Sequence, residues 1–142
     1  MPYAKKNTQG IGLIEIIISV SVLTVGLLGL LQAFPRGIAT EKGLEYATIA
    51  SELAQARLEE YVSYAYADIA TGTIEAQVPV SADTGSLLHK FLRTTEVSLV
   101  DQFLNVTETD IGLKRITVTI AWPSTTGGAA RTTTVRTLVS NR

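Results

Sequence analysis

The feature that most restricts the fold of this chain is an apolar run of 24 residues, Ile11 to Phe34, with a single charged side chain, Glu15. As a helix rising about 1.5 Å per residue, the run can cross a hydrocarbon core of about 30 Å. Its fifteen Ile, Leu, Val and Phe residues each favour insertion by about 0.3–0.6 kcal/mol, which outweighs about 3 kcal/mol for one carboxylate. We therefore expect a membrane-attached protein whose first partner is the lipid bilayer.

The rest of the sequence sets the topology and excludes several classes of function. Lys5 and Lys6 precede the run and no further Lys or Arg occurs before Arg36, so the positive-inside rule predicts a cytoplasmic N-terminus and an extracytoplasmic remainder. With 142 residues in all, that remainder has room for one modest domain. The absence of cysteine excludes a disulfide framework and a thiol nucleophile. A sequence pI of about 5.8, without a basic cluster in the soluble part, predicts no nucleic-acid partner.

The start of the run does not fit a secretory signal peptide. Such a peptide has 7 to 15 apolar residues followed by a small-residue cleavage site, whereas this run is longer and gives way at Pro35 to a new pattern. The small residue, Gly10, instead comes before the run and after a basic stretch. If the chain is cut there, the hydrophobic segment stays with the mature protein.

The residues around Gly10 resemble the class III signal of type IV prepilins. The usual form of that signal is glycine followed by Phe-Thr-Leu-Ile-Glu, and this chain keeps Leu13, Ile14 and Glu15 while Ile-Gly stands in place of Phe-Thr. The resemblance implies cleavage after Gly10 by a prepilin peptidase, with Ile11 as the new N-terminus and a candidate for N-methylation. It also implies that Glu15, with Leu13 and Ile14 beside it, takes part in assembly by meeting the positive N-terminus of a neighbouring subunit.

The physics of Glu15 is consistent with that role. An ionisable group within a membrane span is costly and usually marks a function, and a buried carboxylate is tolerated when an opposite charge meets it. The alternative is a carboxylate near a helix N-terminus, stabilised by the helix dipole and by access to the membrane interface.

Beyond Pro35 the pattern predicts an amphipathic continuation of the same helix. Apolar residues recur every three or four positions on one side and polar residues on the other. The first set is Ala47, Ala50, Ala54, Leu58, Tyr61 and Ala65, and the second is Glu45, Thr48, Glu52, Gln55, Glu59 and Ser63. We expect one helix from about Ile11 to Tyr64, bent at Pro35.

After an irregular connector the period changes to two, which predicts strands. We expect a short strand at residues 74–80 and further strands at residues 91–100, 113–122 and 131–140, with Gly127-Gly128 in the last turn. The apolar side of such an antiparallel sheet needs a cover, and the Ala-rich side of the helix is the only long candidate. The fold class is therefore α+β, a long N-terminal helix on an antiparallel sheet of three or four strands. We divide the chain into residues 1–10 (leader), 11–34 (membrane and assembly helix), 35–65 (amphipathic helix) and 66–142 (connector and sheet domain).

The order of helix and sheet is also similar to that of pilins. The stretches VGLLGLLQAF, LAQARLEEY and KRITVTIAWP most resemble minor pilins of the type IV pilus modification group, and somewhat resemble secretion pseudopilins. The late proline and the missing cysteines favour a minor component over a major pilin. The resemblance implies a structural subunit of a type IV pilus or related filament, which has other pilin subunits and an inner-membrane assembly platform as partners. The alternatives are a pseudopilin of a type II secretion system and a single-pass membrane protein with an extracytoplasmic binding domain.

No set of residues supports catalysis, and we expect no enzyme activity, cofactor or metal. His89 is the only histidine and, without a second His or a Cys, is expected to be a surface or packing residue. Residues 108–112 lack the ligand spacing of a calcium loop and predict a turn. Tyr61, Tyr64 and Tyr66 cluster where the helix ends, where packing against the sheet explains them better than partner recognition.

Overall fold

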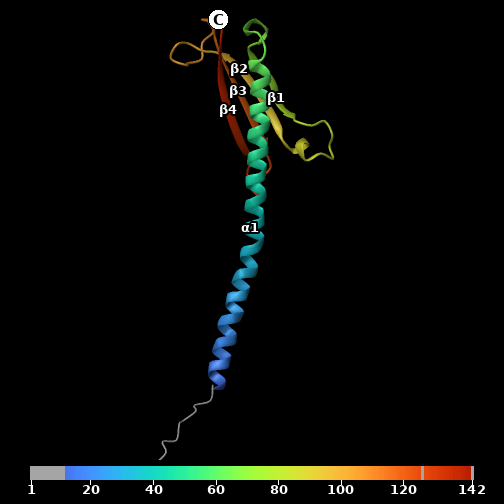
Figure 1. The fold of residues 1–142 in the computed structure, drawn as a ribbon, viewed down its shortest axis with the longest axis vertical. Coiled ribbons are helices and arrows are strands. Elements are labelled where there is room, and N and C mark those ends of the chain that lie inside the picture. Colours follow the sequence, from blue (N-terminus) through green and yellow to red (C-terminus); the bar gives the residue numbers. More distant parts are fainter. Residues whose placement is uncertain (1–11, 126, 142) are drawn as a thin grey trace, which may run out of the picture. The chain divides into compact units, whose positions relative to one another are not determined.

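The computed structural model describes residues 12–125 and 127–141. It contains one long α-helix, α1 (Leu13–Val62), and four strands, β1 (Gly72–Pro79), β2 (Leu92–Leu99), β3 (Leu113–Trp122) and β4 (Arg131–Ser140) (Figure 1). Two short 3₁₀ helices, η1 (Tyr66–Asp68) and η2 (Leu87–Lys90), lie in the connections. The chain divides into two compact units, Met1–Ile38 and Ala39–Arg142, and each is described by itself. The described part of the second unit is called the α+β domain below.

The helix α1 continues without interruption through Pro35 and Gly37. Proline within a helix removes one backbone hydrogen bond without necessarily ending the helix. The bend expected there stays a prediction. The helix ends at Val62, two residues before the predicted Tyr64. Just beyond it the Ser63 hydroxyl donates to the carbonyl of Glu60 at 2.6 Å, and Ala65 adopts an extended conformation. Ala65 is accordingly exposed and does not belong to the packed side of the helix.

The sheet is a four-stranded antiparallel meander in which each strand pairs with the next along the chain, in the order β1-β2-β3-β4. The pairs β2–β3 and β3–β4 are regular, whereas β1 carries two register shifts against β2. The turn between β3 and β4 contains Gly127 and Gly128 at φ values of 79° and 105°, a backbone region that side chains disfavour. The predicted turn at these glycines is confirmed.

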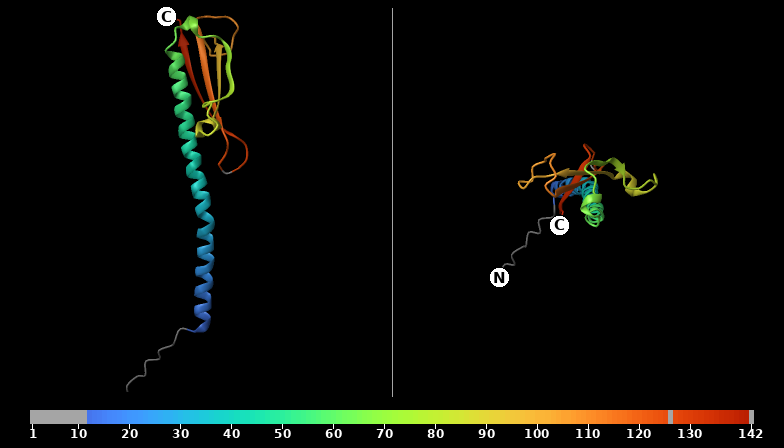
Figure 2. Two further views of the ribbon diagram at one scale, coloured as in Figure 1. Left: turned by 90° about the vertical axis from the view of Figure 1, so that its right-hand side faces the viewer. Right: turned by 90° about the horizontal axis from the view of Figure 1, so that it is seen from above.

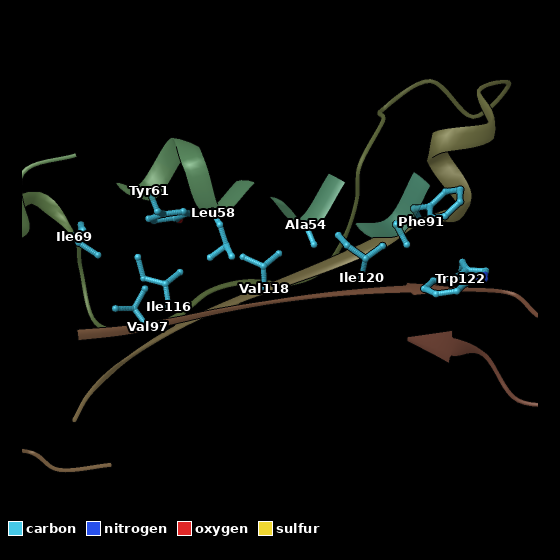
Figure 3. Packing of buried hydrophobic residues seen from close by; sticks show 11 residues of the cluster. Ala54, Leu58, Tyr61, Ile69, Phe91, Val97, Ile116, Val118, Ile120 and Trp122 are labelled. Carbon is cyan, nitrogen blue, oxygen red and sulfur yellow. The ribbon is translucent and has the colours of Figure 1, made fainter. Parts of the chain in front are cut away.

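The core of the α+β domain lies between one side of α1 and the inner face of the sheet (Figure 2). Figure 3 shows Ala54, Leu58 and Tyr61 of the helix pointing toward the alternating residues of β3. The core comprises Ala50, Ala54, Leu58, Tyr61, Ile69, Phe91, Val97, Ile116, Val118, Ile120 and Trp122. At one end of this core Phe91 makes ring contacts with Tyr46 and Trp122, with centroid distances of 5.6 and 6.2 Å.

The structure confirms the predicted α+β class, with a four-stranded sheet. Strands β3 and β4 have the predicted bounds, and β2 begins and ends one residue inside the prediction. Strand β1 begins at Gly72 and ends at Pro79, one or two residues from the prediction at each end. Its register shifts against β2 disturb the alternation of period two that sequence reasoning uses to find strand ends.

Candidate functional site

The apolar part of α1 has no cover within the described chain. The large apolar side chains from Leu13 to Phe34 are 51–76% exposed. Removing so much contiguous apolar surface from water is strongly favourable. By length and composition this segment is a candidate membrane span, a test that a signal sequence near the N-terminus also passes. Lipid or other apolar helices around the segment would remove this surface from water.

Two hydroxyl groups inside this segment are satisfied by the helix itself. Ser21 donates to the carbonyl of Ile17 and Thr24 to that of Val20, each at 2.7 Å. A polar group in a hydrocarbon environment must find its partner within the protein, and bonding to the carbonyl four residues earlier meets that need. These two polar side chains therefore do not prevent burial in lipid or in a helix bundle.

The predicted processing and assembly residues fall at the start of α1. Leu13, Ile14 and Glu15 form its first turn, with all three side chains exposed. The Glu15 carboxylate forms no ion pair within the described residues, and a neighbouring molecule can reach it. Gly10 and Ile11 lie outside the described residues, so the cleavage position stays a prediction.

In the α+β domain an ion cluster around Glu75 joins the helix to two strands. Arg93 donates to both carboxylate oxygens of Glu75 at 2.8 and 2.7 Å, and the Thr95 hydroxyl donates at 2.7 Å. From α1, the Nη2 of Arg57 lies 3.1 Å from Glu75 Oε1, and Arg57 also pairs with Glu60. Partial burial acts to raise the pKa of Glu75, but the hydrogen bonds from Arg93 and Thr95 and the two positive charges outweigh it and lower that pKa.

A second cluster closes the segment that follows α1. The Lys114 side chain is only 6% exposed, and its Nζ donates to the carbonyls of Tyr66 and Ile69 at 2.8 and 2.7 Å. The same Nζ lies 4.1 Å from the centre of the Tyr66 ring, a favourable cation–π arrangement. The Tyr66 hydroxyl donates to Asp110. Partial burial, this hydrogen bond and the charge of Asp110 raise the pKa of Tyr66 to about 12.

The remaining candidates have structural contacts. His89 Nδ1 lies 2.9 Å from the carbonyl oxygen of Ser81, a packing contact within the connector. Asp110 Oδ1 accepts from the backbone N–H of Gly112 at 2.7 Å, which forms the turn predicted at residues 108–112. Tyr61 is buried in the core, while Tyr64 is exposed and meets it edge-on at 5.6 Å. Across the described ranges, no group of three or more His, Cys, Asp or Glu side chains could hold a metal ion.

Sequence reasoning missed both charged clusters, although one of them had a signal. Lys114 continues the alternation of Ile116, Val118 and Ile120 toward the inner face of the sheet, so the period of two already placed a lysine among core residues. Glu75 gave no such signal. Its contacts cross 18 to 20 residues of chain and depend on the irregular pairing of β1 with β2.

Comparison with known proteins finds no matching family model, no matching curated protein and no matching solved structure. The class of the protein therefore rests on its fold alone, which is α+β with a candidate N-terminal membrane span.

Proposed function

We propose that this chain is a structural subunit, a minor pilin, of a type IV pilus or related filament. In this proposal a prepilin peptidase cuts the chain after Gly10, and residues 11–34 hold it in the bacterial inner membrane. The same residues then pack against other pilin subunits when an assembly platform moves the protein into the filament.

The observation that carries the proposal is the uncovered apolar surface of α1 from Leu13 to Phe34. Lipid and neighbouring apolar helices both remove that surface from water, so one segment can serve as a membrane anchor and later as filament core. A plain anchor has no need of Glu15, whose carboxylate costs free energy in the hydrocarbon region. A positive N-terminus on a neighbouring subunit would offset that cost, since a buried charge is tolerated when it is paired.

The first experiment measures the intact mass and the N-terminal residue of the protein recovered from its native membrane. A chain that starts at Ile11, with or without one added methyl group, supports prepilin processing. A chain that still starts at Met1 or Pro2 would overturn the proposal. A single-pass membrane protein with an extracytoplasmic binding domain would then become the leading hypothesis.

Assembly is tested by replacing Glu15 with Ala in the full-length chain. We expect normal cleavage but a loss of incorporation into sheared filaments of at least about a hundredfold, since leaving one member of a buried pair unpaired costs about 3–5 kcal/mol. The matched control is Glu52→Ala, because Glu52 is an exposed helix carboxylate outside the apolar segment. Equal incorporation of both variants would contradict the role of Glu15. Recovery in short periplasmic assemblies rather than surface fibres would favour the secretion pseudopilin.

A further inference from the structure

One end of the α+β domain exposes an apolar surface together with two arginines. The loop between β2 and β3, drawn in orange in Figure 1, carries Phe103, which is 74% exposed, and Leu104, which is 48% exposed. Beside it lies a shallow hollow of about 310 Å³, lined by Leu104, Arg115, Arg136, Thr137 and Leu138. Phe103 together with Leu104, Arg115, Arg136 and Leu138 is called the tip patch.

The loop that presents the tip patch is fixed by its own hydrogen bonds. Asp101 Oδ1 accepts from the backbone N–H groups of Phe103 and Asn105, both at 2.8 Å, and the Asn105 side chain donates to Asp101 Oδ2 at 3.2 Å. Leu104 is held at a φ of 65°, a left-handed conformation that costs a branched residue free energy. A surface already held in one conformation loses little entropy when a partner docks.

The charges of the tip patch favour a partner with carboxylates. On the face of the sheet away from α1, Arg115 stands opposite Leu138 and Arg136 stands opposite Thr117. Neither guanidinium forms an ion pair within the described part of the chain. Arg115 Nη1 donates to the carbonyl of Leu104 at 3.3 Å, and its buried Nε has no hydrogen-bond partner there. Glu96, which also stands opposite Thr117, forms no ion pair with either arginine. The patch therefore fits an apolar side chain flanked by carboxylates.

The same chain carries such a surface at the other end of the domain. Glu41, Leu44 and Glu45 of α1 are all exposed, Leu44 by 67%, and neither carboxylate has an ion pair in the described ranges. These three residues, called the helix base, share one side of the helix because residues three and four apart are neighbours. The β3–β4 turn lies at this end, where Thr125 donates to the carbonyl of Ala39 at 2.8 Å. The β2–β3 loop with the tip patch lies at the opposite end of β3 (Figure 2).

We propose that the tip patch of one copy binds the helix base of a second copy, with Leu44 at the hollow and Glu41 and Glu45 toward Arg115 and Arg136. The two surfaces are different and lie at opposite ends of the domain, so the contact is head-to-tail and repeats from copy to copy. This inference rests on the proposed filament function and adds to it a contact between the α+β domains, separate from the packing of the apolar segments.

Disulfide cross-linking tests this contact directly, because the sequence has no cysteine. The full-length chain in sheared filaments carries Thr48→Cys, one turn from Leu44, and Ser140→Cys, two residues from Leu138 on the same face; both positions are exposed. Oxidation should give a ladder of dimers, trimers and larger species. The matched control pairs Thr48→Cys with Thr132→Cys, an exposed position near the other end of β4, and should give no ladder.

Charge reversal then separates specific docking from crowding. Adding Arg136→Glu should lower the cross-linking yield about tenfold or more, because like charges in a contact are costly, and adding Glu45→Arg to the same chain should restore it. A chain with Leu27→Cys alone reports association through the apolar segment. The contact between tip patch and helix base is overturned if Leu27→Cys cross-links while the Thr48–Ser140 pair gives no ladder. It is also overturned if charge reversal does not change the cross-linking yield. In both cases the proposed assembly through the apolar segment stands. If neither reporter cross-links, both are overturned.

Discussion

Replacing Lys114 with Met tests the cluster that joins β3 to the segment after α1. The substitution keeps most of the apolar stem and removes the ammonium group, which makes two hydrogen bonds to backbone carbonyls and one ring contact. Hydrogen bonds to a charged group contribute about 1.5–3 kcal/mol each. The desolvation cost of a buried ammonium, which the variant no longer carries, offsets part of that sum. We expect the domain to lose about 2–4 kcal/mol of unfolding free energy.

The assay is equilibrium unfolding of the full-length chain in mild detergent by urea. Trp122, the only tryptophan, is buried in the domain core, so its fluorescence follows unfolding of the domain rather than of the apolar segment. With a urea dependence of about 1.5 kcal/mol per molar for a domain of this size, a loss of 3 kcal/mol lowers the midpoint by about 2 M. Lys90→Met, at an exposed lysine, is the control and should leave the midpoint unchanged. A Lys114→Met midpoint equal to that of the control would refute the stabilising role of the cluster.

Two further perturbations concern the contacts of α1 within the domain. The folded-state pKa of Glu75 is lower than its ordinary value of 4.5. The stability that Glu75 contributes is therefore present above pH 4.5 and is lost as the pH falls through the folded-state pKa. Thermal unfolding from about pH 7 to about pH 3 should show this loss of stability, and the loss should be smaller in Glu75→Gln. If Glu75→Gln lost as much stability over this pH range as the unchanged protein, the stabilising role of the Glu75 cluster would be contradicted. Gly43→Ala should stabilise the helix by about 1 kcal/mol only when Thr125 is also Ala, because a Cβ at Gly43 would stand 3.3 Å from the Thr125 hydroxyl. Thermal unfolding measures the effect of Gly43→Ala with Thr125 present and with Thr125→Ala. Equal effects would show that the loop between β3 and β4 moves aside freely.

Much of the fold follows from periodicity, because burial on one side of an element leaves a direct record in the sequence. The apolar side of α1 and the alternation in β3 both predicted which residues form the core, from Ala50 and Ala54 to Ile116 and Val118. The position of Glu15 in the first turn of the helix also followed from the apolar run.

The rest depended on contacts between distant parts of the chain. The meeting of Glu75 with Arg57 and Arg93 requires the actual register of β1, which two irregularities shift. The tip patch was not predicted either. The exposure of Phe103 results from the hydrogen bonds of Asp101 within its loop, and no periodic pattern records such bonds.

The meander order of the sheet has a consequence for how the domain forms. Because every strand pairs with its neighbour along the chain, each pairing closes a connection of at most 13 residues. The contacts of α1 with β3 join residues more than fifty positions apart, such as Ala54 with Ile120, and closing a longer loop costs more entropy. We therefore expect the sheet to form first and the contacts of the helix to be completed after the transition state, so that Leu58→Ala in α1 speeds unfolding more than it slows folding.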